Sequence, residues 1–155
     1  MERFTTLLRP ADPGEPSVVL SLSHEQRRRA KLRVELPDGV AVGLSLPRGL
    51  SLKDGDRLLA EETGKVARVK AQPEHLSVVE TQDTLLLARA AYHLGNRHVA
   101  VQVCAGSLRY LRDHVLDDMV RGLGLAVIGS TLPFEPEGGA YAHAGTHGGH
   151  THGHA

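Results

Sequence analysis

Cysteine, tryptophan and long apolar runs are scarce or missing in this chain of 155 residues, which has one cysteine, Cys104, and no tryptophan. A single cysteine excludes an internal disulfide framework and fits a reducing compartment. No apolar run approaches the roughly 20 residues that a membrane span needs. The start, MERFTTLLRPADPGEP, lacks the apolar core of a signal peptide. We therefore expect a cytoplasmic protein that does not associate with membranes.

An excess of charge of either sign is also missing, since 18 basic residues face 18 acidic ones with the histidines counted as neutral. Nothing global therefore attracts nucleic acid. The basic stretch RRRAKLR at 27–33 contains no aromatic side chain, which disfavours RNA binding. The sequence contains no G-x-S-x-G elbow, no phosphate-binding glycine loop followed by lysine, and no H-E-x-x-H. We expect a protein that is not an enzyme and does not bind nucleic acid.

Short alternating strands fill the first half of the chain. KLRVEL at 31–36 and VAVGLSL at 40–46 alternate apolar with other residues around the turn PDG, which predicts a β-hairpin. Further turn motifs follow at PRG, KDGD and ETG, at a spacing typical of a small sandwich or barrel. Proline in QPE at 72–74 interrupts strand pairing. We therefore predict a small all-β domain over residues 1–71.

The second half alternates strands with helices. A helix is predicted after the strand at 75–81, with Thr81 as its N-cap, Asp83 in the first turn and Gly95 as a left-handed C-cap. Next come strands at 98–104 and 107–111, a helix at 112–124 and a strand at 125–134; the predicted apolar face of that helix carries Val115, Leu116, Met119 and Leu123. The apolar spacing through Leu108, Leu111 and Val115 would also suit a longer helix in place of the second hairpin strand. The order β-α-β-β-α-β predicts a ferredoxin-like domain over 72–136, and the chain as a whole an α+β fold.

The last segment, 137–155, contains five of the ten histidines among glycine and other small residues. Such a composition cannot form a core, so we predict a disordered tail. Neutral imidazole binds zinc, copper, iron and nickel, and several imidazoles on one tail can surround a single ion. An expression tag or an inert solvated tail is the alternative. The candidate metal ligands of the tail are His143, His147, His150, His152 and His154.

His98 is the candidate ligand within the folded part, at the expected start of a strand just after the helix end. One imidazole is too few for tight binding, whereas two copies related by a two-fold axis supply two from rigid elements. The pattern therefore favours a homodimer. A hydrogen-bonded histidine at a strand start is the equal alternative. The only asparagine, Asn96, and its neighbour Arg97 would then satisfy free carbonyls at the helix end.

The other histidines are weaker candidates. His93 lies in the last helical turn, where the helix dipole alone favours a charged imidazole. His114 has Asp117 and Asp118 three and four residues further along, which forms either a weak second site or a solvated surface. Cys104, in an alternating strand, fits a small buried hydrophobic residue better than a ligand. No function is assigned to the isolated histidines, His24 and His75.

Three motifs carry a resemblance to a known family: YHL followed by GNRH at 95–98, LRYLRDHVLDDMVRGLG at 108–124, and PFEPEGGAY at 133–141 before the histidine-rich end. Together they resemble the urease accessory protein UreE family of nickel metallochaperones. The resemblance implies a peptide-binding-like β domain, a ferredoxin-like metal-binding domain and a homodimer formed through the latter. It also implies that His98 and its symmetry mate bind Ni²⁺, with tail histidines completing the coordination.

The implied function is delivery of nickel to apo-urease, with other accessory proteins, including the GTPase UreG, as partners. Zn²⁺ or Cu²⁺ can substitute, because imidazole does not select nickel. Some relatives have a histidine pair two residues apart where this chain has Arg112 and His114. The shorter tail predicts few ions per dimer. The competing hypotheses are a passive nickel or zinc buffer and a peptide-binding scaffold acting through the β domain.

Overall fold

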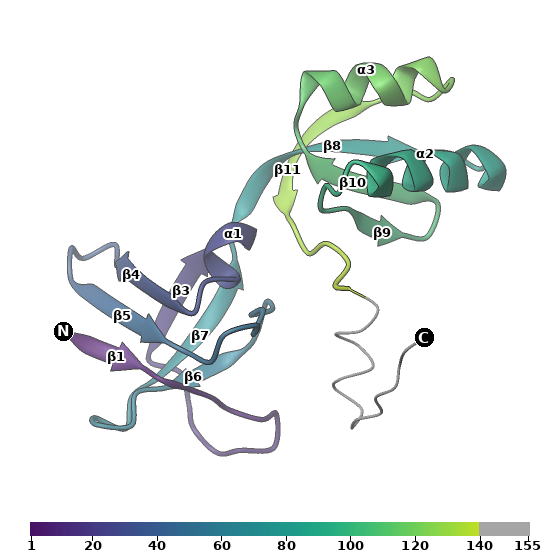
Figure 1. Cartoon of the computed structure of the whole chain (residues 1–155). Coiled ribbons are helices and arrows are strands. Elements are labelled where there is room, and N and C mark those ends of the chain that lie inside the picture. The colour runs from purple at the N-terminus through teal and green to yellow at the C-terminus, as the bar shows by residue number, and fades with distance from the viewer. Residues whose placement is uncertain (140–155) are drawn as a thin grey trace. The chain divides into compact units, whose positions relative to one another are not determined.

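The computed structural model describes residues 1–139 and has a mixed α+β fold (Figure 1). The chain forms two compact units. Of the described residues, the first unit comprises 1–74 and 131–135, and the second comprises 75–130 and 136–139. No helix among residues 1–139 is long and apolar enough to cross a membrane. The helices and strands of the two units confirm the predicted α+β fold.

One sheet of the first unit contains three strands in the order β1 (Glu2–Phe4), β5 (Ala41–Ser45) and β4 (Lys31–Glu35) (Figure 1). Strands β4 and β5 are antiparallel, which confirms the predicted hairpin. Gly39 adopts a φ of 86° in its turn, in the left-handed region that glycine enters without steric cost. Apolar residues from one face of this hairpin enter the core because side chains alternate along a strand.

The second sheet of this unit has the strand order β2, β6, β7, β3. Its strands are β2 (Thr6–Leu7), β6 (Arg57–Leu59), β7 (Val66–Ala71) and β3 (Val18–Leu22), and a one-turn helix, α1 (His24–Arg27), follows β3. Turns fall at the three predicted motifs, where the glycines all have positive φ. The two sheets enclose one apolar cluster, whose fully buried members include Phe4, Leu20, Leu22, Leu58, Ala67 and Val69.

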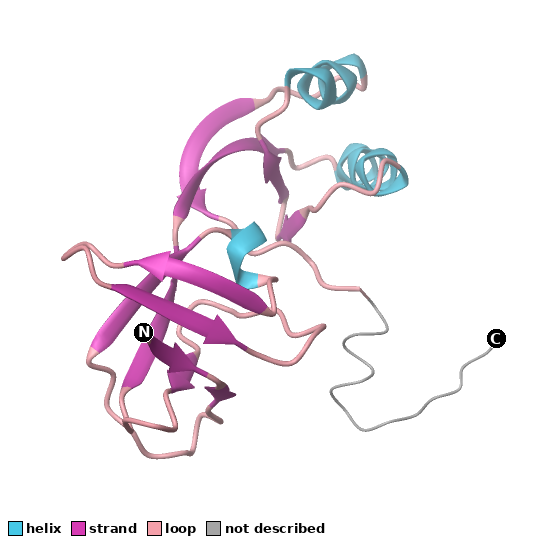
Figure 2. Cartoon of the chain, turned by 60° about the vertical axis from the view of Figure 1, so that its left-hand side comes forward, coloured by secondary structure: helices cyan, strands magenta, loops and turns pink. Residues whose placement is uncertain are grey.

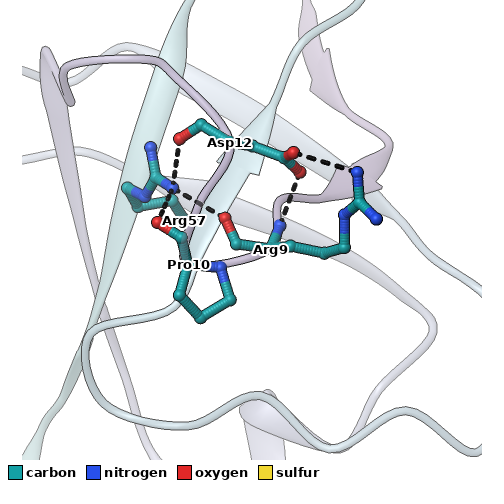
Figure 3. Close-up of polar contacts among 4 residues, drawn as sticks. All are labelled: Arg9, Pro10, Asp12 and Arg57. Carbon is teal, nitrogen blue, oxygen red and sulfur yellow. Dashed lines mark hydrogen bonds and ion pairs between the residues drawn. The ribbon is translucent and has the colours of Figure 1, made fainter.

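Arg57 on β6 organises the loop between β2 and β3 (Figure 3). Its guanidinium donates to the carbonyls of Asp12, Gly14, Arg9 and Pro10 at 2.7, 2.8, 2.9 and 3.3 Å. The Asp12 carboxylate in turn accepts from the Arg9 amide at 2.8 Å and from its guanidinium at 3.3 Å. The backbone bond from Arg9, more than its charge, lowers the pKa of Asp12. One side chain thus donates hydrogen bonds to loop carbonyls that are not bonded to a neighbouring strand.

Arg27, the first residue of the basic stretch, is buried in the first unit. Its guanidinium donates to the carbonyls of Leu52 at 3.2 Å and Leu22 at 2.9 Å, and also to the carbonyl of Phe134. The Phe134 ring is fully buried and packs edge-on against His24, with 5.5 Å between ring centroids. These contacts hold residues 131–135 against the first unit, so this arginine has a structural role.

The second unit has the predicted order of strands and helices, arranged as a sheet in the order β11, β8, β10, β9. Figure 2 shows its two helices on one side of the sheet. Val79, Leu108 and Tyr110 of the sheet and buried residues of both helices form one apolar cluster. The elements are β8 (Pro73–Glu80), α2 (Thr84–Asn96), β9 (Gln102–Cys104), β10 (Ser107–Leu111), α3 (His114–Gly122) and β11 (Ile128–Pro133). The ferredoxin-like prediction is confirmed, and the longer-helix alternative is wrong.

The ends of α2 differ from the prediction. Asp83, not Thr81, is the N-cap, because its carboxylate accepts from two free amides of the first turn. Thr81 instead accepts a bond from the Asp83 amide. Gly95 is not a left-handed cap but lies inside the helix, and the left-handed residue is His98 with a φ of 58°. His98 therefore lies in a turn, and the following strand begins only at Gln102.

The predicted apolar face of α3 is also partly wrong. Val115 is 52% exposed, while Leu116 and Val120 are buried together with Asp117. The helix is rotated so that Asp117 faces the sheet, where its carboxylate has hydroxyl partners. The orientation of α3 therefore depends on hydrogen bonding to the buried Asp117 carboxylate as well as on the burial of apolar side chains.

Candidate metal site

The turn that carries His98 closes the C-terminal end of α2. The Arg97 amide donates to the Leu94 carbonyl at 3.1 Å, and the His98 amide donates to the Gly95 carbonyl at 3.0 Å. His98 takes the left-handed backbone position that usually holds glycine after a helix. For a residue with a Cβ this conformation costs roughly 1–2 kcal/mol. Such local strain is a feature of functional positions, where a particular side chain is needed.

The His98 side chain is exposed, whereas both flanks of its turn are anchored in the core. Leu94 on the last turn of α2 is fully buried, and Val99 and Val101 pack against the same apolar cluster. Since the backbone is held on both sides, the direction of the exposed imidazole is restricted mainly by its own χ angles. The site is thus one solvent-facing donor on a fixed turn.

A backbone hydrogen bond attaches the C-terminal segment three residues after His98. The Glu137 amide donates to the Val101 carbonyl at 2.8 Å, and Val101 is only three residues after His98. Glu137 and Val101 both belong to the second unit. The remaining predicted ligands, at 143, 147, 150, 152 and 154, lie outside the described residues.

His93 and His114 occupy different surroundings from His98. The His93 ring in the last turn of α2 is half-buried and packs edge-on against the exposed Tyr92 ring, with 5.2 Å between centroids. His114 is the exposed first residue of α3. The carboxylate of Asp118 lies 3.4 Å from the Arg121 guanidinium, on the exposed side of the helix. These contacts give His93 and Asp118 partners other than a metal.

Asp117 belongs to a buried network that sequence analysis missed. One of its carboxylate oxygens accepts from the Ser77 hydroxyl at 2.6 Å and from the Tyr110 hydroxyl at 2.7 Å. Burial, followed by the hydrogen bond to Asp117, raises the pKa of Tyr110. The only indication in the sequence was that Asp117 shares a helical face with Val120. The carboxylate is committed to these hydroxyls and is not grouped with His114 and Asp118 around a metal position.

The remaining candidates are equally dispersed among residues 1–139. Cys104 is a half-buried free thiol on β9. His24 packs on Phe134, and burial followed by the charge of Arg27 lowers its pKa. His75 is exposed at its position on β8. Within the described part of the chain, no three histidine, cysteine or carboxylate side chains gather at one metal position.

Comparison with known proteins identifies the family. Residues 4–72 match the N-terminal domain of the UreE urease accessory protein, and residues 74–155 match its C-terminal domain. The urease accessory protein UreE of Proteus mirabilis is 47% identical over 147 residues, which cover 91% of each chain. That of Citrobacter koseri is 50% identical over 143 residues, covering 92% of this chain and 93% of its own. These relatives are named as accessory proteins, which confirms the prediction that the chain is not an enzyme. The chain belongs to the urease accessory protein UreE family.

Proposed function

We propose that this protein is a metallochaperone that binds Ni²⁺ through His98 and delivers it to apo-urease. The observation that carries the proposal is the exposed imidazole on a strained, anchored turn beside the point where the C-terminal segment is pinned. Membership of the urease accessory family supplies the biological setting. Strain at an exposed histidine has no evident benefit for folding, so a ligand role is its best explanation.

A homodimer follows from the number of donors. In one chain His98 belongs to no group of three potential ligands among residues 1–139. A nickel ion needs several nitrogen or oxygen donors for firm binding. A two-fold axis next to the turn would bring His98 of the partner subunit to the same ion. The metal would then hold two subunits together as well as being held by them.

The C-terminal histidines are the proposed remaining donors. From the pinned Glu137, His143 is six residues further along the chain and His154 is seventeen. An extended chain covers at most about 3.3–3.6 Å per residue, so His143 lies within roughly 20 Å of that point and His154 within roughly 60 Å. The imidazole at 98 is within the reach of every histidine from 143 to 154. His93 and His114 remain weaker candidates.

Proton competition should make binding reversible in mildly acidic solution. Imidazole binds a metal only when neutral, and its ordinary pKa is about 6.5. Binding should therefore weaken steeply below about pH 6. Zn²⁺ and Cu²⁺ should also bind, because affinity for nitrogen donors rises from nickel to copper. Cellular supply and partners, rather than these ligands, would make nickel the cargo. We propose apo-urease and the accessory proteins, including the GTPase UreG, as partners in the cytoplasm.

Isothermal titration of the full chain with NiCl₂ tests the ligand assignment. His98→Ala should remove the tightest site, and truncation after Tyr141 should lower affinity or stoichiometry while leaving a site. Arg97→Ala is the matched control, since it alters an exposed side chain in the same turn without removing an imidazole. An unchanged isotherm for both test variants would contradict the assignment.

Delivery is tested separately by activation of apo-urease. The loaded protein should activate it faster than free nickel at the same nickel activity. Equal rates would favour a passive buffer. Sedimentation of the metal-free protein at several concentrations tests the dimer, and a monomer that binds nickel with full affinity would refute the interfacial site.

A further inference from the structure

A cationic cavity opens on the three-stranded sheet of the first unit. Its volume is about 400 Å³. It is lined by residues of β1, β4 and β5 and by Met1, which directly precedes β1. Gly43 on β5 pairs with Arg3 on β1 on one side and with Arg33 on β4 on the other. The three residues therefore lie in one row across the sheet, on the same face.

Gly43 forms the floor of this cavity because it has no side chain. A Cβ at this position would lie 3.2 Å from Cε of Met1 and 3.5 Å from Cγ of Arg3. Its φ is not in the left-handed region, so backbone conformation does not require glycine there. A β-branched residue would suit a central strand better. The lack of a side chain at Gly43 thus costs strand stability and leaves room for the side chains of Met1 and Arg3 to pack over β5.

The charge of the cavity is uncompensated within residues 1–139. Arg3, Lys31 and Arg33 line it with exposed side chains, and none of the three forms a hydrogen bond or an ion pair there. Glu35, on the same face of β4, pairs with Ala41 beyond the cavity. Glu2 is held by Lys65, 3.7 Å away, and by Thr63. Since the whole chain is neutral, this is a local cluster and not part of a general positive field.

We propose that this cavity, the Arg3–Arg33 groove, binds an extended acidic segment of a partner protein with carboxylates at alternate positions. Lys31 and Arg33 lie two residues apart on one strand, a separation of roughly 6.6–6.8 Å, which equals the separation of alternate side chains in an extended peptide. Strand β1 lies two strand spacings from β4, about 9–10 Å across the sheet, so Arg3 faces the same segment from its other side. A guanidinium can bind each carboxylate in bidentate fashion.

The lining favours a peptide over a nucleic acid. Single-stranded nucleic acids are bound by basic grooves with aromatic side chains on which the bases stack. No aromatic residue lines this groove, and Met1 supplies the apolar side chain on the same face as the three cations, whereas Leu32 and Leu44 face the core. The inference concerns a docking function in the first unit and does not depend on the proposed metal site.

NMR titration of the full chain with a synthetic heptapeptide, acetyl-Ala-Glu-Leu-Glu-Leu-Glu-Ala-amide, tests the groove. We expect shifts of the backbone amides of β1, β4 and β5. The double variant Arg3→Gln/Arg33→Gln should raise the dissociation constant about tenfold, as expected for the loss of two exposed charge pairs. Gly43→Thr should weaken binding similarly with every charge kept, because its side chain would displace those of Met1 and Arg3 from the floor of the groove.

The matched control is Arg28→Gln/Lys70→Gln, which removes the same charge from exposed positions outside the groove. It should change the dissociation constant less than twofold, and the peptide with glutamine in place of glutamate should not bind. An equal loss in both double variants would show non-specific attraction and overturn the proposal. Tighter binding of a uridine decamer, lost in Arg3→Gln/Arg33→Gln, would assign the groove to RNA and also overturn it.

Discussion

Replacing His98 by glycine should stabilise the metal-free protein and at the same time remove its tightest nickel site. The left-handed conformation at φ 58° costs a residue with a Cβ roughly 1–2 kcal/mol. Glycine avoids this cost but loses about 0.5–1 kcal/mol more conformational entropy on folding. The net gain in unfolding free energy should be about 0.5–1 kcal/mol. The imidazole offsets none of this, since it forms no hydrogen bond with residues 1–139.

Thermal unfolding with a chelator and with excess NiCl₂ measures both effects. For a chain of this size 1 kcal/mol corresponds to about 2–4 °C in Tm. Without metal the glycine variant should melt about 1–4 °C above the unchanged protein. Nickel at a hundredfold excess over Kd should add about 2.7 kcal/mol to the unchanged protein alone. The order of the two melting temperatures should therefore reverse when nickel is added.

Two controls separate strain from ligand loss. His98→Asn keeps a residue that tolerates the left-handed region but removes the imidazole, so its metal-free Tm should lie between the other two. Arg97→Gly alters the neighbouring position and should keep the nickel-induced rise. The reasoning is refuted when His98→Gly melts lower without metal, or when nickel raises its Tm as much as that of the unchanged protein.

Three further predictions concern the described contacts. Arg57→Ala should lower the unfolding free energy by about 1–2 kcal/mol and accelerate amide exchange in its loop, because the carbonyls of Pro10, Asp12 and Gly14 lose their donor; unchanged exchange would contradict this role. In urea titrations Asp117→Ala should lower the unfolding free energy by about 1–3 kcal/mol, since two buried hydroxyls lose their acceptor. Asp118→Ala should lower it by less than about 0.5 kcal/mol, and equal losses for the two variants would refute the buried network. The lowered pKa of His24 means that the folded state disfavours its protonation, so metal-free stability should fall as pH drops below 6.5. His24→Phe, which keeps a ring against Phe134, should reduce that fall, and an identical pH profile would exclude His24 as its source.

Local patterns were sufficient to predict most elements of the fold. Alternation around a glycine turn specifies a hairpin because both the strands and the turn depend on neighbouring residues, as at Gly39 and Gly106. The order of strands and helices then leaves few possible topologies. The predicted ferredoxin-like order needed no long-range information beyond the rule that successive elements pack together.

Features that depend on distant contacts were missed. Helix α2 continues through Gly95 because burying Leu94 and packing Val99 outweigh the cost of a helical glycine, roughly 1 kcal/mol. Asp117 is buried because hydroxyls from two strands reach it, which no spacing within its own helix reveals. Arg27 binds the carbonyl of Phe134, far along the chain. These positions are set by tertiary packing and not by propensity.

The sequence drew attention to His98 but did not predict the geometry of its turn. His98 stood out through its motif and its place after a helix. The sequence predicted it at a strand start, whereas its backbone is left-handed and in a turn. That difference changes the physical argument, because the position is strained and glycine would suit it better. The metal ligands themselves stay predictions, since the proposed set includes a partner subunit and residues beyond 139.

The bond from the Glu137 amide to the Val101 carbonyl has a kinetic consequence. Ligands tethered by a short linker meet their target at an effective concentration in the millimolar range, independent of the amount of protein in solution. Donors that follow Glu137 would therefore attach to and leave an ion at His98 in unimolecular steps. In the proposed dimer, dilution would separate the subunits before it separated these donors from the ion, and an acceptor protein could replace the donors one at a time.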